Sequence, residues 1–339
     1  MEEFARVDAS TTLSYLAHTI LCVNSLSQNA SKEQKTRYLP ELISGNKIGC
    51  FCMSEPDYGS DAISMQTRAQ ITDGGHILNG TKMWVTNAQY ADVAYVYART
   101  GQGRYDLTTF IVEKGLNGFL VGSPIHKMGM RGSPTAEIIF DNAFVPFANR
   151  LGKGGDSIYH MMRGLEIERI TLAAMSLGIA RGCVEACQNY VSQRKQFGRP
   201  IGDFQLVQKM VAEMTTETDM MAAYLYHVAR QFELGKTGRT DAAQVKLALP
   251  KMATKIALDA IQIHGGYGYS QEFPIERFMR DAKLLEIGGG TNEIMIKLIA
   301  KELTRKNKFT LQTESDICLK SPIPVTSNIS TTPISPMLS

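Results

Sequence analysis

Hydrophobic and polar residues follow two different periods along this chain, and the period changes twice. Residues 1–49 have the spacing of amphipathic helices. Residues 50–150 alternate short runs of β-branched and aromatic residues with turn residues, which predicts strands. Residues 151–308 return to the helical period. Residues 309–339 are rich in Ser, Thr and Pro with little periodicity, which predicts a disordered tail.

Capping and turn residues bound the individual elements. Ser31 is placed to cap a helix in the first region. Asp73-Gly74 and Asn79-Gly80 are dipeptides typical of tight turns. The predicted strands are Thr67–Ile71, His76–Leu78, Lys82–Thr86, Val93–Ala98, Thr108–Glu113 and Glu137–Phe140. The predicted later helices, the third of them kinked at Pro250, are Gly155–Arg194, Asp203–Leu234, Asp241–His264 and Asn292–Thr304.

Composition and charge argue against several classes of function. The 339 residues are 44% hydrophobic and 20% charged, as in ordinary globular proteins. The net charge of +3 is small and the basic residues form no stripe, so nucleic-acid binding has little support. No apolar run approaches the length of a membrane helix. The six cysteines are scattered without a CxxC pair, which favours reduced thiols and predicts no metal site.

Two glycine clusters lie within the segment Gln262–Glu293, at residues 265–268 and 288–290. Glycine lets a backbone approach a ligand closely and adopt a positive φ. The second cluster opens onto Thr291 and an apolar-periodic helix, whose first N–H groups could hold an anion. The alternative interpretation is two helix caps joined by a loop.

A single carboxylate lies on the apolar stripe of the predicted helix Gly155–Arg194. Glu166 and Arg169 point away from this stripe, whose members are Met161, Leu165, Glu168, Leu172, Met175 and Ile179. A carboxylate among Met and Leu loses hydration, which raises its pKa toward the range of a general base. Periodicity alone favours the alternative, in which Glu168 pairs with a buried Arg or Lys from a neighbouring helix.

Four motifs together resemble the acyl-CoA dehydrogenases, a family that uses FAD. They are Cys52–Asp61 (CMSEPDYGSD), Trp84–Asn87 (WVTN), Arg194–Gly198 (RKQFG) with Gln205, and Gln262–Glu293. The resemblance runs from about Met1 to Phe309. It implies an α+β fold with an N-terminal helical segment, a central antiparallel β-domain and a C-terminal four-helix bundle. The family has further helices before the point where this chain starts, has no counterpart of the tail, and prefers a small residue at Tyr58.

The resemblance assigns these motifs to the flavin and to the acyl-CoA. Taken without the family, the first motif is a turn, Trp84 is a core aromatic and Arg194 is a basic helix end. In the family, Arg194 and Gln205 reach across to a neighbouring subunit's flavin. The implied FAD contacts are Phe51, Cys52, Met53, Ser54, Gly59, Ser60, Trp84, Val85, Thr86, Arg194, Gln205, Gln262, Ile263, His264, Gly265, Gly266, Thr291, Asn292 and Glu293. The implied acyl-CoA contacts are Ser60, Tyr159, Glu166, Ile167, Glu168, Arg169, Gly289 and Gly290.

The position of the catalytic base distinguishes branches of this family. Many members carry a glutamate just before the Gly-Thr of the last motif, where this chain has Gly289. The isovaleryl-CoA and long-chain branches carry it on an earlier helix in a Leu-x-x-Glu-Arg context, which residues 165–169 match at Glu168. The surrounding sequence, including Lys127–Ser133 and Glu286–Thr291, is most similar to the isovaleryl-CoA branch.

The resemblance therefore implies an oxidoreductase that converts a short branched acyl-CoA to its 2-enoyl-CoA, with Glu168 removing the α-proton. The backbone N–H of Gly289 and the flavin ribose would stabilise the enolate. Electrons would pass to an electron-transfer flavoprotein, and the protein would be a homotetramer of the mitochondrial matrix without a membrane span. The alternatives are a long-chain acyl-CoA dehydrogenase, an acyl-CoA oxidase and a non-catalytic truncated isoform.

Overall fold

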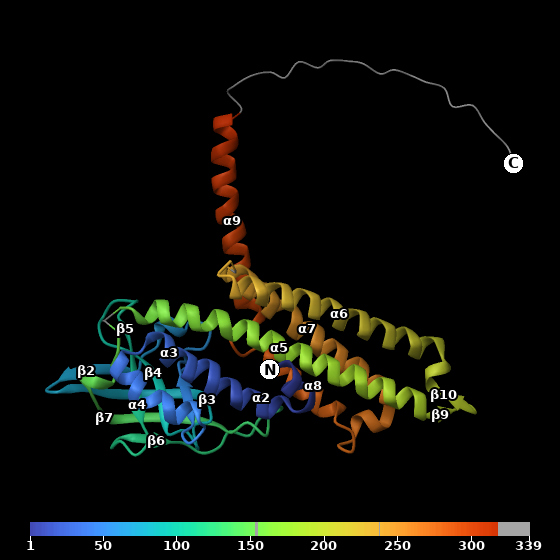
Figure 1. Cartoon of the computed structure of the whole chain (residues 1–339), viewed down its shortest axis with the longest axis horizontal. Coiled ribbons are helices and arrows are strands. Elements are labelled where there is room, and N and C mark those ends of the chain that lie inside the picture. The colour runs from blue at the N-terminus through green and yellow to red at the C-terminus, as the bar shows by residue number, and fades with distance from the viewer. Residues whose placement is uncertain (153–154, 237, 318–339) are drawn as a thin grey trace. The chain divides into compact units, whose positions relative to one another are not determined.

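The computed structural model describes residues 1–152, 155–236 and 238–317, with side chains described as far as residue 304. The chain forms two compact units, Met1–Ile299 and Ala300–Ser339. The first unit contains a group of helices, a β-sheet and a helical bundle, in that order along the chain (Figure 1). The predicted α+β layout is therefore confirmed.

Short helices form the N-terminal region. Ser31 begins the last of them with a capping box, in which its hydroxyl accepts from the Gln34 N–H, as predicted. The first helix packs on the bundle, where Glu2 and Arg181 form an ion pair at 2.8 Å. The elements are α1 (Glu2–Val7), α2 (Ala9–Leu16), the π-helical η1 (Ala17–Asn24), α3 (Ser25–Asn29) and α4 (Lys32–Ile43).

The middle region is an eight-stranded sheet with the order β6-β7-β3-β2-β4-β5-β8, and β1 pairs with β4. Most neighbours are antiparallel, as predicted, but the β1–β4 and β2–β4 pairs are parallel. Strands β1, β6 and β8 were not predicted because runs of four, three and two residues are too short to show a period. The strands are β1 (Gly49–Cys52), β2 (Arg68–Thr72), β3 (Gly75–Thr86), β4 (Val93–Arg99), β5 (Leu107–Glu113), β6 (Phe119–Val121), β7 (Thr135–Pro146) and β8 (Arg150–Leu151).

One of the two predicted tight turns is wrong. Asp73-Gly74 is the hairpin turn between β2 and β3. Asn79-Gly80 instead lies inside β3, so two predicted strands are one, and the register with β7 shifts there. Gly80 has a φ of 143°, and a Cβ at this position would lie 2.6 Å from Thr67. The glycine is therefore needed for the bulge in β3 and for the close approach of Thr67 to its backbone, and not for a reversal of the chain.

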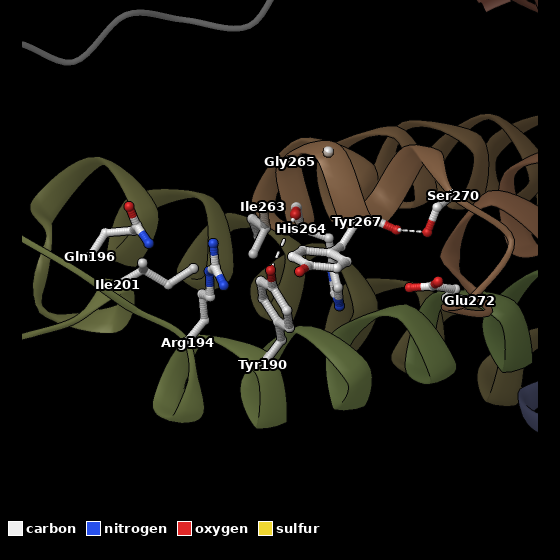
Figure 2. Close-up of a pocket in the computed structure, with 11 residues that line it drawn as sticks. Tyr190, Arg194, Gln196, Ile201, Ile263, His264, Gly265, Tyr267, Ser270 and Glu272 are labelled. Atoms are coloured by element: carbon white, nitrogen blue, oxygen red, sulfur yellow. Dashed lines mark hydrogen bonds between the residues drawn. The ribbon is translucent and has the colours of Figure 1, made fainter.

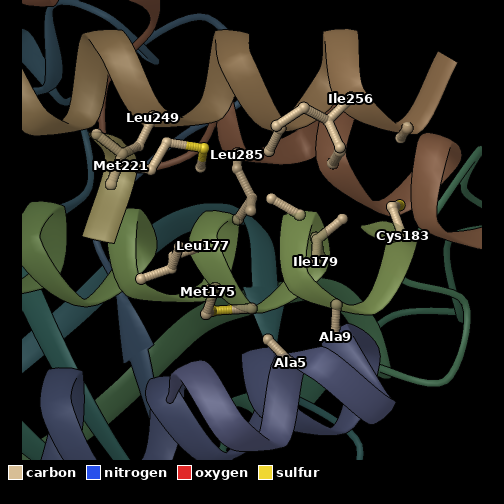
Figure 3. Packing of buried hydrophobic residues seen from close by; sticks show 14 of the residues in the cluster. Ala5, Ala9, Met175, Leu177, Ile179, Cys183, Met221, Leu249, Ile256 and Leu285 are labelled. Carbon is tan, nitrogen blue, oxygen red and sulfur yellow. The ribbon is translucent and has the colours of Figure 1, made fainter. Parts of the chain in front are cut away.

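The third region is a bundle of α5 (Ser157–Gln193), α6 (Gln205–Glu233), α7 (Arg239–His264) and α8 (Ile275–Leu285). Helix α5 packs on the other three, and Pro250 lies inside α7. The shared core is aliphatic and sulfur-rich, and Figure 3 shows Met175, Leu177, Ile179, Cys183, Met221, Leu249, Ile256 and Leu285 interdigitating within it. A short hairpin, β9 (Lys195–Gln196) and β10 (Arg199–Pro200), joins α5 to α6.

Helix α8 is the main element that sequence reasoning missed. Its eleven residues lie between the two glycine clusters, and its charges obscured the apolar stripe. Arg280 and Glu276 pair at 2.6 Å on one face, while Ile275, Phe278 and Leu285 are buried on the other. Helix α9 (Asn292–Ile317) continues past residue 309, where the tail was predicted to begin, and residues 318–339 of that tail lie outside the described part.

One described helix, α5, is long and apolar enough to cross a membrane by length and composition alone. The expectation that no such run exists was therefore wrong. However, 72% of that stretch is buried inside the molecule, as in the core helix of a folded domain. The apolar character of α5 is explained by its central position in the bundle, where it contacts α1, α6, α7 and α8.

Candidate active site

Glu168 is the centre of the candidate active site. It lies on the apolar stripe of α5, where Met161, Leu172 and Met175 are buried, as predicted. Glu168 itself is 9% exposed. Its carboxylate forms no hydrogen bond or salt bridge with any residue that the structure describes. A nearly buried carboxylate without a direct partner has the environment that a general base needs.

The turn between α8 and α9 brings the second glycine cluster against this carboxylate. A Cβ built at Gly289 would lie 3.5 Å from both Cδ and Oε1 of Glu168, and 2.5 Å from Cδ1 of Leu172. Gly289 also has a φ of +67°, which side-chain-bearing residues rarely adopt. Position 289 therefore lacks both the space and the backbone conformation for a side chain. The Glu168 carboxylate occupies the place that such a side chain would approach.

Two buried cations surround the site at longer range. Burial raises the pKa of Glu168 to about 7, and the positive charges of Arg169 and Lys246 act in the opposite direction. Arg169 was predicted to point away from the apolar stripe, but it is buried and its Nε donates to the Gly289 carbonyl at 3.4 Å. Lys246 of α7 is also buried and donates to the Gly290 carbonyl. The alternative, in which Glu168 forms a salt bridge with a buried Arg or Lys, is therefore not observed. Arg169 and Lys246 attract the carboxylate only at longer range.

Aromatic side chains of the β-domain also approach Glu168. Burial raises the pKa of Tyr97, with Tyr95 and the charge of Glu168 adding to the effect. Phe51 stacks on Tyr95 with ring centroids 5.7 Å apart and meets Tyr97 edge-on at 5.5 Å. Leu165 of α5 packs in the same cluster. Tyr97, the ring that the charge of Glu168 affects, therefore belongs to a cluster of aromatic and aliphatic side chains.

The loop Ser54–Ser60 is held by a buried ion pair. Lys82 of β3 donates to Glu55 Oε1 at 2.9 Å, and both side chains are almost completely buried. Glu55 and Tyr58 exchange backbone hydrogen bonds of 3.2 Å, which closes a tight turn, and Tyr58 is half-buried. The turn interpretation of this motif is therefore confirmed. Ser60, the predicted contact of both ligands, is left exposed at its end.

Trp84 is not a core residue, so the core interpretation of this side chain is wrong. The indole is 58% exposed and the residue has a φ of 61°. The register between β3 and β7 shifts between Lys82 and Val85, which marks an irregularity at this point. A positive φ at a bulky residue costs roughly 1–3 kcal/mol and is retained mainly at functional sites. The bulge turns the indole outward, where a flat ligand could stack on it.

The other residues predicted in these motifs differ in accessibility. Cys52 and Val85 are buried in the sheet, so only their backbones could touch a ligand. Tyr159 is exposed on the first turn of α5, close in sequence to the half-buried Glu166 and Ile167. At the start of α9, the Thr291 hydroxyl accepts from the Ile294 N–H at 3.4 Å. The remaining half-buried residues are Met53, Ser54, Thr86 and Asn292, whereas Gly59 and Glu293 are exposed.

A cavity of about 690 Å³ lies at the C-terminal end of α5 (Figure 2). Arg194 makes no salt bridge with any described residue, and its guanidinium lies 5.4 Å from the centre of the Tyr267 ring. Gly265 and Gly266 leave the backbone open, since a Cβ on either would meet nothing within 4 Å. The lining is completed by Tyr190, Gln196, Ile201, Ile263, His264, Ser270 and Glu272.

These residues fit a dinucleotide cofactor. A guanidinium without a carboxylate partner suits a diphosphate, and a bare glycine backbone permits the close approach that a phosphate needs. The aromatic ring of Tyr267 and the cavity volume suit the adenosine portion. In the β-domain, the exposed Trp84 and the half-buried Thr86 provide the flat wall and the polar group that an isoalloxazine ring needs.

The residues assigned to one FAD form two separate groups within the chain. Glu168 lies within α5 and Arg194 directly follows its last residue, 26 positions later (194 − 168), which separates the two by about 39 Å at 1.5 Å per residue. Gly289 lies beside Glu168 and Gly290 beside Arg169, whereas Ile263, His264, Gly265 and Gly266 line the cavity together with Arg194. Gln205, the first residue of α6, is exposed.

Sequence reasoning missed Lys246, Tyr190, Gln196 and Tyr267. A signal for Lys246 was present, because residues 242, 246, 249 and 253 recur at helical spacing and Lys246 is the charged member of an otherwise apolar stripe. Gln196 lies inside the RKQFG motif that was singled out. Tyr190 and Tyr267 carried no signal, since an aromatic at a helix end or in a glycine-rich loop is ordinary.

Comparisons with known proteins agree with this geometry. The chain matches the family descriptions "Acyl-CoA dehydrogenase, N-terminal domain" over residues 1–46, "middle domain" over 50–143 and "C-terminal domain" over 155–304. It is 48% identical to mitochondrial isovaleryl-CoA dehydrogenase of Solanum tuberosum over 90% of this chain and 75% of that protein. It is 45% identical to 2-methylacyl-CoA dehydrogenase of the same plant over 89% and 74%.

Solved structures give the same result. Butyryl-CoA dehydrogenase from Megasphaera elsdenii superposes with a TM-score of 0.87 at 37% identity, covering 89% of this chain and 80% of that one. Glutaryl-CoA dehydrogenase from Mycobacterium smegmatis, in complex with FADH2, has a TM-score of 0.84 at 31% identity, covering 89% and 77%. The chain therefore belongs to the acyl-CoA dehydrogenase family, FAD-dependent oxidoreductases that act on a CH–CH group.

Proposed function

We propose that this protein oxidises a short branched acyl-CoA, isovaleryl-CoA or a close analogue, to the 2-enoyl-CoA. The observation that carries the proposal is the contact between Gly289 and Glu168. The carboxylate lies 3.5 Å from the point where a side chain at position 289 would begin, so it can serve the reaction from α5. The identity of 48% to a plant isovaleryl-CoA dehydrogenase supports the branched substrate.

Glu168 removes the proton α to the thioester. Its pKa of about 7 keeps the carboxylate basic and still ionised in part at neutral pH. The backbone N–H of Gly289, which donates to no described residue, is the hydrogen-bond donor for the thioester oxygen as that oxygen becomes negative. FAD, which would be held by Arg194 at one end and by Trp84 and Thr86 at the other, would supply the acceptor for the hydride of the β-carbon. Glu168 is 9% exposed, so little water reaches the base before the substrate enters.

A short acyl group is supported by the aromatic residues beside Glu168. Phe51, Tyr95 and Tyr97 pack on one another, and the two tyrosines are completely buried. A long acyl chain directed from Glu168 toward Tyr97 would meet this close-packed cluster, and displacing its rings is unfavourable. A branched chain of a few carbons needs no such displacement.

Assembly completes the cofactor site in this proposal. FAD contacts from the β-domain and from Thr291–Glu293 belong to one copy, and Arg194, Gln205 and Gln262–Gly266 belong to a second. The supporting observation is the distance of about 39 Å along α5 between the two groups. Two such pairs make a homotetramer. The electron acceptor is an electron-transfer flavoprotein, and the names of the related plant enzymes support a mitochondrial matrix location.

Anaerobic titration of the purified holoprotein tests the substrate and the reaction together. Isovaleryl-CoA is expected to bleach the flavin absorbance in one rapid phase, whereas palmitoyl-CoA is expected to bleach it slowly or not at all. Faster bleaching by palmitoyl-CoA would show a long-chain enzyme instead. Rapid oxygen consumption without an added acceptor would show an oxidase, and no bleaching by any acyl-CoA would contradict the dehydrogenase proposal altogether.

A further inference from the structure

Lys246 is a fully buried lysine that the proposed reaction does not use. It lies on the apolar stripe of α7 and is 0% exposed. Its ammonium donates one hydrogen bond to a described group, the carbonyl of Gly290. Removing an ammonium from water is costly unless charge and hydrogen bonding compensate for the loss. A lysine kept at this position therefore has a compensating role near the glycine turn.

The glycine turn is held by this lysine and by Arg169. Arg169 donates from Nε to the Gly289 carbonyl at 3.4 Å, and Lys246 donates to the next carbonyl along the chain. Gly289 and Gly290 both have a positive φ, of +67° and +99°, so neither belongs to a helix or strand that would restrain it. Because each trans peptide is planar, Arg169 holds the plane between Gly289 and Gly290, and Lys246 holds the plane between Gly290 and Thr291. Both planes directly follow the peptide that carries the Gly289 N–H.

Glu168 links the same lysine to the acid–base chemistry. Burial lowers the pKa of Lys246 to about 8, while Glu168 favours its charged form and Arg169 opposes it. Glu286 and Glu293, from the turn and from α9, add weaker attraction. Tyr97 is the titratable group that approaches Glu168 from the sheet. At neutral pH an ammonium therefore lies close enough to favour the ionised form of Glu168 without pairing with it directly.

We propose that Lys246 is a positioning residue for the dehydrogenation. Together with Arg169, it holds the carbonyls of Gly290 and Gly289, which restrains the turn that follows the Gly289 N–H, and its positive charge favours the carboxylate form of Glu168. This inference rests on the proposed function for the identity of the base, but the hold on the turn is a property of the protein without substrate. Lys246 itself touches neither the substrate nor the cofactor.

The variant Lys246→Met tests this role, because methionine has a similar shape and no charge. Lys251→Met, on the exposed face of the same helix, is the matched control. In the Lys246→Met holoprotein without substrate, amide hydrogen exchange at Asn292, whose N–H donates to the Glu286 carbonyl at 3.1 Å across the glycine turn, is expected to become about tenfold faster. The acid limb of the pH profile of flavin reduction is expected to move up by about one unit, since a carboxylate that loses a nearby cation is harder to ionise.

Two further variants separate charge from packing. Lys246→Arg retains the charge and is expected to restore the acid limb to its wild-type position. Should Lys246→Met not fold, Lys246→Gln retains a donor without charge, and only the acid limb is expected to move. Wild-type exchange at the turn in Lys246→Met, or an acid limb that moves equally in the Arg variant, overturns the proposal. If no acyl-CoA reduces the wild-type flavin, the proposed function fails while the exchange result still decides whether Lys246 holds the turn.

Discussion

Glu168 occupies a position where an ionised carboxylate is unfavourable to folding. Its pKa in the folded protein, about 7, lies above the ordinary value of 4.5. Between these two values the folded state keeps a proton that the unfolded state releases, so stability falls as the pH rises through this window. Lys246 is protonated in both states over the same window, because its lowered pKa is about 8. An ionised carboxylate at position 168 therefore reduces the stability of the fold.

Glu168→Gln is accordingly expected to stabilise the protein at pH 8 and to have little effect near pH 4.5. The upper bound on the gain is about 3–4 kcal/mol, from the separation of the two pKa values at about 1.4 kcal/mol per unit. Urea unfolding of both proteins at the two pH values measures it. An equal difference in stability at both pH values would show that Glu168 has an ordinary pKa.

Gly289 is the second residue on which the site depends. Gly289→Ala is expected to destabilise the protein by about 1–2 kcal/mol for the positive φ alone, and further by the overlap of the new Cβ with Leu172. Gly288→Ala is the matched control, because a Cβ there meets only ordinary contacts at 3.6 Å. Thermal unfolding of the two variants provides the comparison. Similar melting temperatures for both would contradict the role assigned to Gly289.

At the scale of single elements, the irregular part of β3 is the feature most specific to function. Strand β3 runs for twelve residues, and its register with β7 shifts just where Trp84 turns outward. In a regular strand, side chains point alternately to the two faces of the sheet, so Trp84 would lie on one of these faces. The bulge therefore costs local backbone strain and leaves a large aromatic ring exposed, which is unfavourable unless a ligand covers it.

Trp84→Gly tests this interpretation of the bulge. Glycine tolerates the φ of 61°, and little packing is lost from an exposed indole, so the melting temperature of the protein without FAD is expected to stay the same or rise. FAD retention during dialysis is expected to fall. A large drop in melting temperature together with normal FAD retention would instead make Trp84 a structural residue.

Helices and turns were predicted correctly from the sequence where one signal, an apolar stripe or a turn dipeptide, was not opposed by another. Helices α5, α6 and α7 are long enough for their apolar stripes to be read, and Asp73-Gly74 is a turn of ordinary type. It failed at α8, whose charged face and flanking glycines resembled a loop, and at Asn79-Gly80, where pairing with β7 overrode the local turn preference. Glu168 drew attention because one charge stands out on an apolar stripe, but the role of base was implied by the family resemblance rather than by this pattern. The proximity of Glu168 to Gly289 could not be found, since the two positions are 121 apart along the chain (289 − 168) and only packing joins them.

At the scale of the whole molecule, the division of the cofactor residues into two distant groups has a consequence for mixed assemblies. If Arg194 acts on the flavin of a second copy, a chain with Glu168→Gln and a chain with Arg194→Ala each lack a different half of the same site. Co-expressed chains would form some pairs in which one site has both Glu168 and Arg194 intact. Such pairs are predicted to be active although neither parent is.

The expected recovery in the co-purified mixed pairs is roughly half of the wild-type activity at limiting FAD, because each mixed pair has one intact site of two. Activity is measured after the two tagged chains are co-purified, with each parent alone as the control. No recovery in verified mixed pairs would mean that both groups of residues act within one chain, contrary to the distance along α5.

The assignment of Glu168 as the base is tested most directly by the single-turnover rate of flavin reduction with isovaleryl-CoA in Glu168→Gln. Glu185→Gln, on the outer surface of the same helix, is the matched control. Loss of a general base is expected to slow flavin reduction by about 10²–10⁴-fold in Glu168→Gln, while Glu185→Gln stays close to the wild-type rate. A Glu168→Gln protein that binds isovaleryl-CoA and reduces its flavin at the wild-type rate would show that another group removes the proton.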